Sequence, residues 1–142
     1  MTTARDMMHE GATCIPEHET LDRAAEMMRM YQVGSLPVCG DDDRLKGIIT
    51  DRDIVVKCVA LGRDPAYTTA AELAEGDLVW VDATDDADEV LAVMVDHLIR
   101  RVPVLENKHL VGMISEADVA THLPAEKVAA YCSAVYSAPS HL

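Results

Sequence analysis

Apolar residues recur along the chain at spacings that predict a short series of strands and helices. An amphipathic helix is predicted by apolar positions at three- and four-residue intervals: Leu21, Ala24, Ala25, Met28 and Tyr31. Short apolar runs on either side predict strands that flank this helix. The expected elements are, in order, a lead-in helix (about 3–8), a strand (13–15), the amphipathic helix (21–31), two strands (35–39 and 45–49) and a second helix (50–61).

The same order of elements returns in the second half of the chain. A shift of 66 residues places Leu36-Pro37-Val38 on Val102-Pro103-Val104, and after the shorter second hairpin the shift becomes 65. Thr20 and Asp86 are expected to cap the two longer helices. The matching elements are a lead-in helix (about 69–75), a strand (79–81), a helix (87–97), two strands (101–105 and 110–114) and a last helix (115–123) that Pro124 stops. Such a repeat predicts two copies of one β-α-β-β-α unit.

Each unit contains one copy of a short motif at the point where a strand meets a helix. The copies are Gly47-Ile48-Ile49-Thr50-Asp51-Arg52-Asp53 and Gly112-Met113-Ile114-Ser115-Glu116-Ala117-Asp118. A hydroxyl residue followed three positions later by an acidic residue has the spacing of a capping box, which needs no ligand. Free N–H groups at a helix start also bind anions such as phosphate, and a neighbouring aspartate can hold the hydroxyls of a ribose. Both interpretations stay open.

A third helix is expected after the second unit. Residues 125–136 place Val128, Tyr131, Cys132 and Val135 on one helical face. This face packs either on its own domain or on a partner subunit, and the pattern does not choose between the two.

Composition and charge exclude several classes of partner. Of the 142 residues 49% are hydrophobic but none is Phe, so the core is expected to be aliphatic and rich in Met. A formal net charge of −13 argues against binding to nucleic acid or an anionic membrane. No apolar run has the length of a membrane span, and the N-terminus lacks the profile of a signal peptide. We therefore expect a cytoplasmic protein, although leaderless export would leave no trace in the sequence.

The four cysteines have no metal-like spacing. No CxxC pair occurs, and a buried, small hydrophobic role is expected for cysteines of a cytoplasmic protein. Cys14 and Cys39 each lie on a predicted strand of the first unit. If those strands are neighbours, a disulfide between the two residues is geometrically feasible.

The repeated order of elements resembles a tandem pair of CBS domains, the Bateman module. The segments that carry the resemblance are Val33-Gly34-Ser35-Leu36-Pro37-Val38, Leu45-Lys46 with the first motif and Ile54, and Arg100-Arg101-Val102-Pro103-Val104. It is most similar to the small stand-alone two-CBS proteins of bacteria. The resemblance implies an α+β fold of two CBS domains packed about a pseudo-twofold axis, a homodimer, and a stress or hypoxia setting. The expected boundaries are 3–65 and 69–123 for the two domains and 125–142 for a C-terminal helix and tail.

The resemblance also implies two adenine-nucleotide sites, for AMP, ADP or ATP. In such modules the motif aspartate holds the ribose, the hydroxyl residue holds phosphate, and apolar residues of the first two strands enclose the adenine. Carried over by position, one site comprises Thr50, Asp53, Ile15, Val38 and Arg52, and the other comprises Ser115, Asp118, Val81 and Val104. Arg52 has no basic counterpart, so the two sites are expected to differ. The charge of −13 opposes a polyanionic ligand.

Histidines provide a second candidate site. In a CBS fold the helices that carry His97 and His122 are neighbours, so both imidazoles are expected to converge. Imidazole pairs suit zinc, with Asp96, Asp118 or a partner subunit completing the shell. An ordinary hydrogen-bonded histidine pair is the alternative. Four other histidines lie in polar stretches and are expected to be solvated: His9, His18, His109 and His141.

No arrangement in the sequence indicates an enzyme. There is no nucleophile with an identifiable base and no Gly-rich phosphate loop of the P-loop type. Two functions follow from the sequence. One is a regulatory module that senses a small, nucleotide-like effector and signals to an unknown partner protein. The other is an interaction dimer that binds no nucleotide and is stabilised by a disulfide or a metal.

Overall fold

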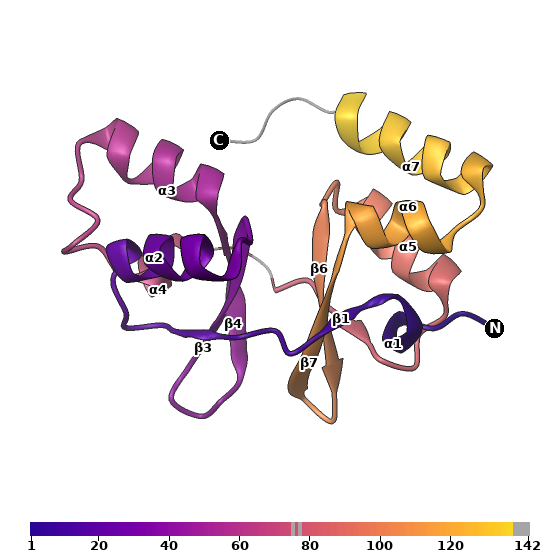
Figure 1. The fold of residues 1–142 in the computed structure, drawn as a ribbon, viewed down its shortest axis with the longest axis horizontal. Helices are drawn as coiled ribbons and strands as arrows, with labels where there is room; N and C mark the ends of the chain where they lie inside the picture. The colour runs from indigo at the N-terminus through magenta and orange to yellow at the C-terminus, as the bar shows by residue number, and fades with distance from the viewer. Residues whose placement is uncertain (75, 77, 138–142) are drawn as a thin grey trace. The chain divides into compact units, whose positions relative to one another are not determined.

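The computed structural model describes residues 1–74, 76 and 78–137, and it contains two compact units (Figure 1). Residues 13–78 form one of them, which we call the continuous unit. The other joins residues 1–12 to the chain from Val79 onward, and we call it the split unit. Each unit has its own sheet and its own apolar core.

The continuous unit is a three-stranded sheet with helices. Its sheet order is β2-β3-β4, with β2 parallel to β3 and β3 antiparallel to β4. The core is formed by apolar side chains from the strands, α2, α3 and α4. The elements are β2 (Ile15–Pro16), α2 (Leu21–Tyr31), β3 (Ser35–Cys39), β4 (Leu45–Thr50), α3 (Asp51–Lys57), the 3-10 turn η1 (Val59–Leu61) and α4 (Ala70–Leu73).

The split unit repeats this plan with one more strand and one more helix. Its sheet order is β1-β7-β6-β5, and β1 pairs antiparallel with β7. The elements are α1 (Ala4–Met7), β1 (His9–Glu10), β5 (Val81–Asp82), α5 (Ala87–Asp96), β6 (Arg101–Glu106), β7 (His109–Ser115), α6 (Glu116–His122) and α7 (Ala125–Ser137).

The predicted order of strands and helices is confirmed, with three differences in detail. The first strand of each repeat lies about two residues later than predicted, at β2 and β5. The helix predicted over 50–61 is interrupted at Cys58, whose φ and ψ of −121° and −70° are not helical, so α3 gives way to η1. Strand β1 was not predicted, because its two residues, His9 and Glu10, are polar and exposed and leave no apolar pattern.

Helix α2 buries one face against the sheet of the continuous unit. The buried residues are Leu21, Ala24, Met27 and Met28, which follow the helical period closely. The predicted stripe is wrong at its edges, since Ala25 and Tyr31 are exposed. The stripe predicted for α5 is also wrong at its end, because the helix ends at Asp96 and the next residue, His97, is exposed. The C-cap of α2, Gln32, is in the left-handed region, whereas the C-cap of α5, His97, is right-handed and is followed by the left-handed Leu98.

Four helices begin with a capping box. In each, the carboxylate of the third helical residue accepts the backbone N–H of the N-cap residue, which stands just before the helix. The pairs are Thr3 with Asp6 (α1), Thr50 with Asp53 (α3), Thr69 with Glu72 (α4) and Ser115 with Asp118 (α6). These hydrogen bonds lower the pKa of Asp6 and of Glu72. Asp86 caps α5 as predicted. Thr20 occupies the N-cap position of α2 as predicted, but its hydroxyl donates to Asp22 and makes no capping hydrogen bond.

The two lead-in helices are exchanged between the sequence repeats. Helix α1 precedes the first repeat, yet its buried residues Ala4 and Met7 belong to the core of the split unit, with the second repeat. Helix α4 precedes the second repeat, and its Ala70 and Leu73 belong to the core of the continuous unit. The compact units therefore end near residues 12 and 78, whereas the sequence repeats begin near residues 3 and 69.

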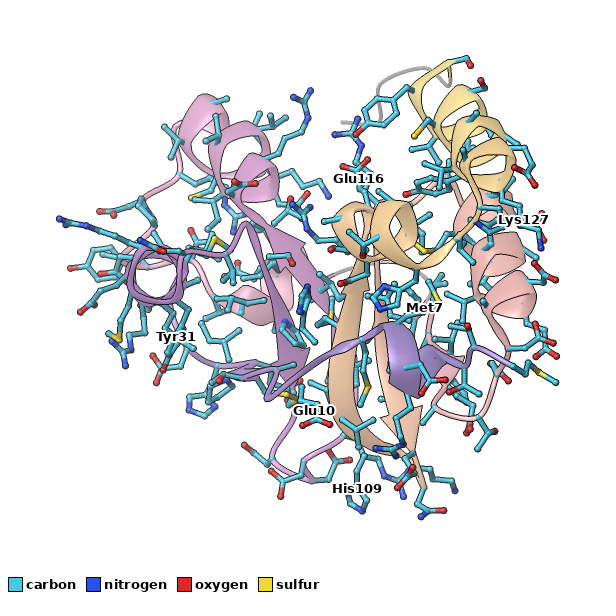
Figure 2. The ribbon with its side chains drawn as sticks, turned by 45° about the vertical axis from the view of Figure 1, so that its right-hand side comes forward. Met7, Glu10, Tyr31, His109, Glu116 and Lys127 are labelled. Atoms are coloured by element: carbon cyan, nitrogen blue, oxygen red, sulfur yellow. A yellow bond between two sulfur atoms is a disulfide. The ribbon has the colours of Figure 1, made fainter. Side chains whose placement is uncertain are left out.

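Helix α7 packs on its own unit. Tyr131 and Val135 are buried in the core of the split unit, where α7 contacts both α5 and α6. Lys127 reaches from α7 to Asp88 of α5 (Figure 2). Within the described part of the chain, no helix is long and apolar enough to cross a membrane.

Candidate functional site

The glycine of each motif lies beneath a lead-in segment. A Cβ added to Gly112 would lie 2.7 Å from the carbonyl oxygen of His9 and 2.5 Å from the Sδ of Met8. A Cβ added to Gly47 would lie 3.0 Å from the Cβ of Ala74. Glycine within a strand is typical of a place where another segment approaches closely. The motif glycines therefore leave room for the lead-in segments to cross the strands.

The first motif presents a carboxylate that is partly accessible. The Oδ2 of Asp53 accepts the N–H of Thr50 at 2.9 Å, and the Thr50 hydroxyl accepts the N–H of Asp53 at 3.0 Å. The other oxygen, Oδ1, lies 3.2 Å from Nζ of Lys57, one helical turn on. The Asp53 side chain remains 21% exposed. Arg52 lies beside it, and its N–H donates to Asp51.

The second motif presents a carboxylate that is closed in. The Oδ2 of Asp118 accepts the N–H of Ser115 at 2.8 Å and its hydroxyl at 3.0 Å. The Oδ1 lies 2.8 Å from Nε2 of His9, which comes from β1. Asp118 is only 4% exposed. Equivalent aspartates of the two repeats thus have a lysine from the same helix in one case and a histidine from a distant strand in the other.

Sequence reasoning missed His9, which was expected to be merely solvated. Its contact with Asp118 depends on the pairing of β1 with β7, and no local pattern predicts that pairing. The glycine at 112 was the available signal, because it indicates that another backbone crosses the strand there.

A polar cluster from α7 lies against the start of α6. The hydroxyl of Tyr136 donates to the carboxylate of Glu116, which Figure 2 labels. The guanidinium carbon of Arg100 lies 4.5 Å from the centre of the Tyr136 ring, a cation–π contact. The hydrogen bond to Glu116 raises the pKa of Tyr136, because its ionisation would place two negative charges together. Arg100 is thus engaged by α7.

The four apolar residues predicted to enclose an adenine are core residues of their units. Ile15 pairs with Val38 across β2 and β3, and Val81 pairs with Val104 across β5 and β6. All four side chains are buried. Their contact with a ligand stays a prediction. Because the side chains are buried, main-chain atoms would make such a contact unless the core opens.

His97 and His122 both belong to the split unit and are both exposed. The Nδ1 of His122 lies 2.9 Å from the carbonyl oxygen of Asp118 and 3.1 Å from the hydroxyl of Thr121. Nδ1 of His122 therefore faces the backbone of its own helix. Among the described residues, no group of three or more His, Cys, Asp or Glu side chains is placed to hold a metal ion. A metal at these histidines would need a further ligand.

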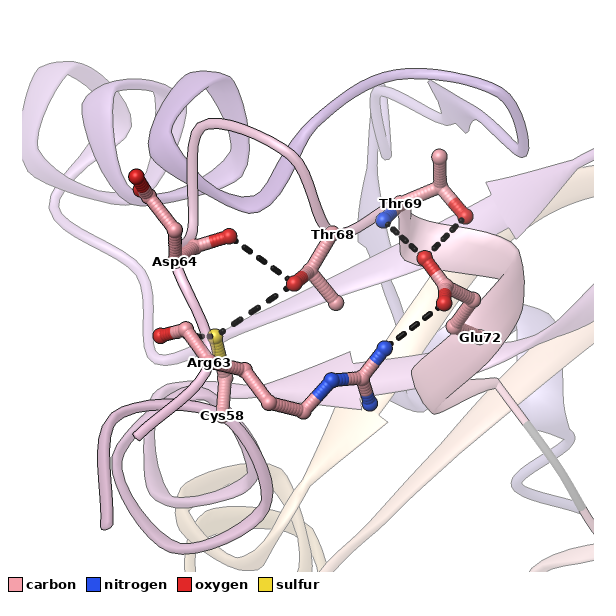
Figure 3. Close-up of polar contacts among 6 residues, drawn as sticks. All are labelled: Cys58, Arg63, Asp64, Thr68, Thr69 and Glu72. Carbon is pink, nitrogen blue, oxygen red and sulfur yellow. Dashed lines mark hydrogen bonds and ion pairs between the residues drawn. The ribbon is translucent and has the colours of Figure 1, made fainter. Parts of the chain in front are cut away.

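The disulfide predicted between Cys14 and Cys39 is present. The two Cα atoms are 5.7 Å apart, and the bond joins the residue before β2 to the last residue of β3. Cys58 is a free, buried thiol. It contacts the hydroxyl of Thr68 at 3.8 Å and the carbonyl of Arg63 at 3.5 Å, which fastens the loop before α4 (Figure 3). Cys132 is free and partly buried.

The chain belongs to the CBS domain family. The family model for the CBS domain matches it twice, at residues 4–59 and 70–125. Hypoxic response protein 1 of Mycobacterium tuberculosis is 52% identical over 137 residues, which cover 96% of each chain. The CBS domain-containing protein YhcV of Bacillus subtilis is 31% identical over 122 residues, which cover 86% of each chain. The predicted fold of two CBS domains is confirmed.

Solved structures agree with this assignment. A crystal structure of hypoxic response protein I with two coordinated zinc ions has a TM-score of 0.79 and 55% sequence identity, covering 87% of this chain and 100% of that one. The CBS domain protein TA0289 of Thermoplasma acidophilum, of unknown function, has a TM-score of 0.85 over 96% of this chain and 77% of its own, at 15% identity, which shows the fold alone. CBS domains are generally regulatory rather than catalytic.

Proposed function

We propose that this chain is a non-catalytic regulatory CBS-pair protein that binds zinc through His97 and His122 and acts as a homodimer on a partner protein. The observation that carries the zinc proposal is the orientation of His122. A metal-binding imidazole usually donates its second N–H to a carbonyl or carboxylate, which fixes the tautomer and aims the other nitrogen at the metal. The carbonyl of Asp118 provides that partner for Nδ1 of His122.

The donor set fits zinc in its chemistry. Zinc favours imidazole nitrogens and commonly takes four ligands in structural sites. The described part of this chain offers no third ligand beside the two histidines. Water molecules are therefore the proposed source of the remaining ligands, because the dimer interface proposed below lies on the continuous unit and the two histidines lie on the split unit. The related structure with two coordinated zinc ions supports zinc binding.

Replacing either histidine should abolish zinc binding. We expect protein purified with zinc to retain the metal, and His97→Ala and His122→Ala to lose it, as measured by elemental analysis and by a fall in melting temperature with chelator. At a zinc concentration 100 times the Kd, binding would stabilise the native state by ~2.7 kcal/mol. His109→Ala, at an exposed hairpin position of the same unit, is the matched control. Zinc retained in both variants would contradict the proposal.

An adenine nucleotide at the first motif is the second candidate function. The partial exposure of Asp53 favours it, because the carboxylate can accept hydrogen bonds from a ribose while Lys57 and Arg52 offset charge on a phosphate. Two observations weigh against it. Both motifs are complete as capping boxes, and the net charge of −13 repels anions.

Calorimetric titration with AMP, ADP and ATP tests this second function. If a nucleotide binds, Asp53→Ala should weaken it by about tenfold or more, since a charge-assisted pair of hydrogen bonds is lost. Asp118→Ala should leave that affinity unchanged, because Asp118 is occupied within the chain. The absence of heat at millimolar nucleotide would argue against a nucleotide sensor.

We propose that the homodimer forms through the helices of the continuous unit. Six exposed large apolar residues lie on or next to α2, α3 and η1: Met30, Tyr31, Val33, Val55, Val59 and Leu61. Helices α2 and α3 together carry four acidic and four basic residues, whereas α5 and α6 carry five acidic residues and no Lys or Arg. In a chain of net charge −13, a neutral apolar surface is where a second copy meets the least repulsion.

A charge placed on this surface should break the dimer. We expect a mass of twice 15.5 kDa for the wild-type protein by light scattering, and the mass of one chain for Val59→Glu. Tyr67→Glu, at an exposed position outside these helices, should remain dimeric. A dimeric Val59→Glu variant would place the interface elsewhere.

The proposed setting is a response to hypoxia or a related stress, by analogy with the name of the 52% identical relative. We propose a cytoplasmic location by default. Disulfides persist mainly in oxidising surroundings, so Cys14–Cys39 favours oxidising conditions during part of the protein's life.

A further inference from the structure

Asp118 stands out as a charged residue buried within the described part of the chain. Both of its oxygens are occupied. The capping box takes Oδ2 and His9 takes Oδ1, at 2.8 Å. A buried carboxylate is stable only when its hydrogen-bonding capacity is met. The contact with His9 is the part of this arrangement that comes from outside the motif.

The N-terminal segment holds His9 in place. Met7 anchors α1 in the core, and β1 pairs His9 with Met113 and Glu10 with Gly112. Figure 2 labels Met7 of α1 and Glu10 of β1. The His9 side chain itself remains 72% exposed. His9 is therefore a cover placed over the carboxylate from the solvent side, not a core residue.

The equivalent aspartate has no such cover among the described residues. Asp53 is 21% exposed, and its partner is Lys57, on the same helix and 44% exposed itself. Lysine side chains on a helix surface exchange conformations readily, so an added ligand can displace this ion pair. Residue 75, which the shift of 66 residues matches to His9, lies outside the described residues.

We propose that His9 is an internal occupant of the second motif, and that α1 and β1 form a lid that closes Asp118 to added ligands. An added group that donates two hydrogen bonds, such as a vicinal diol, can then reach Asp53 and not Asp118. His9 thus determines which of two repeated motifs is open. This lid goes beyond the proposed function. Only the titration with AMP described below rests on the second candidate function.

Chemical labelling of carboxylates tests the lid without any ligand. A water-soluble carbodiimide with an amine modifies accessible carboxylates, and peptide mass spectrometry reads each site. We expect Asp53 to react and Asp118 to be protected in the wild-type protein. His9→Ala should raise the labelling rate of Asp118 by about tenfold. The variant loses one hydrogen bond to a charged group, so the segment that covers Asp118 opens more often. His9→Gln keeps a donor and should stay near the wild-type rate.

Two glycine variants provide an independent test and a matched control. In Gly112→Ala the new Cβ would meet the backbone of His9 at 2.7 Å, so β1 must move and Asp118 should react although His9 is still present. Gly47→Ala perturbs the equivalent crossing at Ala74 and should leave Asp118 protected. His18→Ala, which removes an exposed histidine 3.9 Å from Asp41, should also leave it protected. Circular dichroism confirms that each variant is folded.

Two results would overturn the lid. One is labelling of Asp118 in the wild-type protein at the rate of Asp53. The other is continued protection of Asp118 in both His9→Ala and Gly112→Ala, which would assign its burial to the packing of α6. Titration with AMP adds the nucleotide arm: a second binding site in His9→Ala supports the proposal. No AMP binding in any variant would count against the nucleotide function, while labelling still decides the lid.

Discussion

Truncating Met7 to alanine should loosen the second sequence repeat and leave the first unchanged. Met7 precedes the first repeat, but its buried side chain belongs to the core of the split unit. Large-to-small changes at such a site cost ~2–5 kcal/mol, because apolar contacts are lost and a cavity remains. Hydrogen exchange followed by mass spectrometry should therefore rise in β6, β7 and α5, with little change in β3 and β4.

Leu73→Ala is the reciprocal variant. Leu73 precedes the second repeat and is buried in the core of the continuous unit, so exchange should rise in α2, β3 and β4. Tyr67→Ala, at a residue 86% exposed and outside the proposed dimer surface, is the control and should change the free energy of unfolding by less than about 0.5 kcal/mol. If Met7→Ala loosened β3 and β4 instead, the lead-in helices would not be exchanged as described.

This exchange marks the limit of what the sequence predicted about the fold. The repeat, the hairpins and the long helices were predicted because each leaves a periodic apolar pattern within 10 to 20 residues. The lead-in helices were predicted as elements, but their partners were not. Ala4 and Met7 have the same apolar character whichever core receives them, so only long-range packing distinguishes the two arrangements.

Local rules worked unevenly at the candidate sites. The disulfide followed from strand adjacency, because β2 lies beside β3 and Cys14 immediately precedes β2. The capping boxes of the two motifs followed from spacing alone, whereas those at Thr3 and Thr69 were not predicted. Thr20 stands at the N-cap of α2 as predicted, yet its hydroxyl donates to the carboxylate of Asp22, two residues on, and does not cap the helix. The contact of His9 with Asp118 spans the length of the chain, and no spacing rule reaches that far.

Tyr131→Ala should detach α7 and cost the protein ~3–5 kcal/mol of stability, the range for truncating a buried aromatic residue. Tyr131 is 1% exposed, and its hydroxyl donates to the carbonyl of Ile99 at 2.9 Å. Denaturant unfolding measures the loss. Tyr131→Phe keeps the ring and removes only the donor, so a smaller loss of ~1–2 kcal/mol is expected, from the unsatisfied carbonyl.

Alkaline pH provides a second measure of the same residue. Burial raises the pKa of Tyr131 above the ordinary value of a tyrosine, so the folded state favours the neutral phenol. Stability from this group is complete below about pH 10, the pKa in the unfolded chain, and is lost as the pH rises toward the folded-state pKa. Tyr131→Phe should lose less stability over that interval than the wild-type protein.

Tyr136→Ala separates the packing of α7 from its surface contacts. Tyr136 is 53% exposed, and its bonds to Glu116 and Arg100 lie at the surface, where such contacts contribute less than about 1 kcal/mol. Its loss should therefore be small beside that of Tyr131→Ala. If Tyr131→Ala were as mild as Tyr136→Ala, the apolar face of α7 would not be anchored in its own unit, and it would be available to a second subunit.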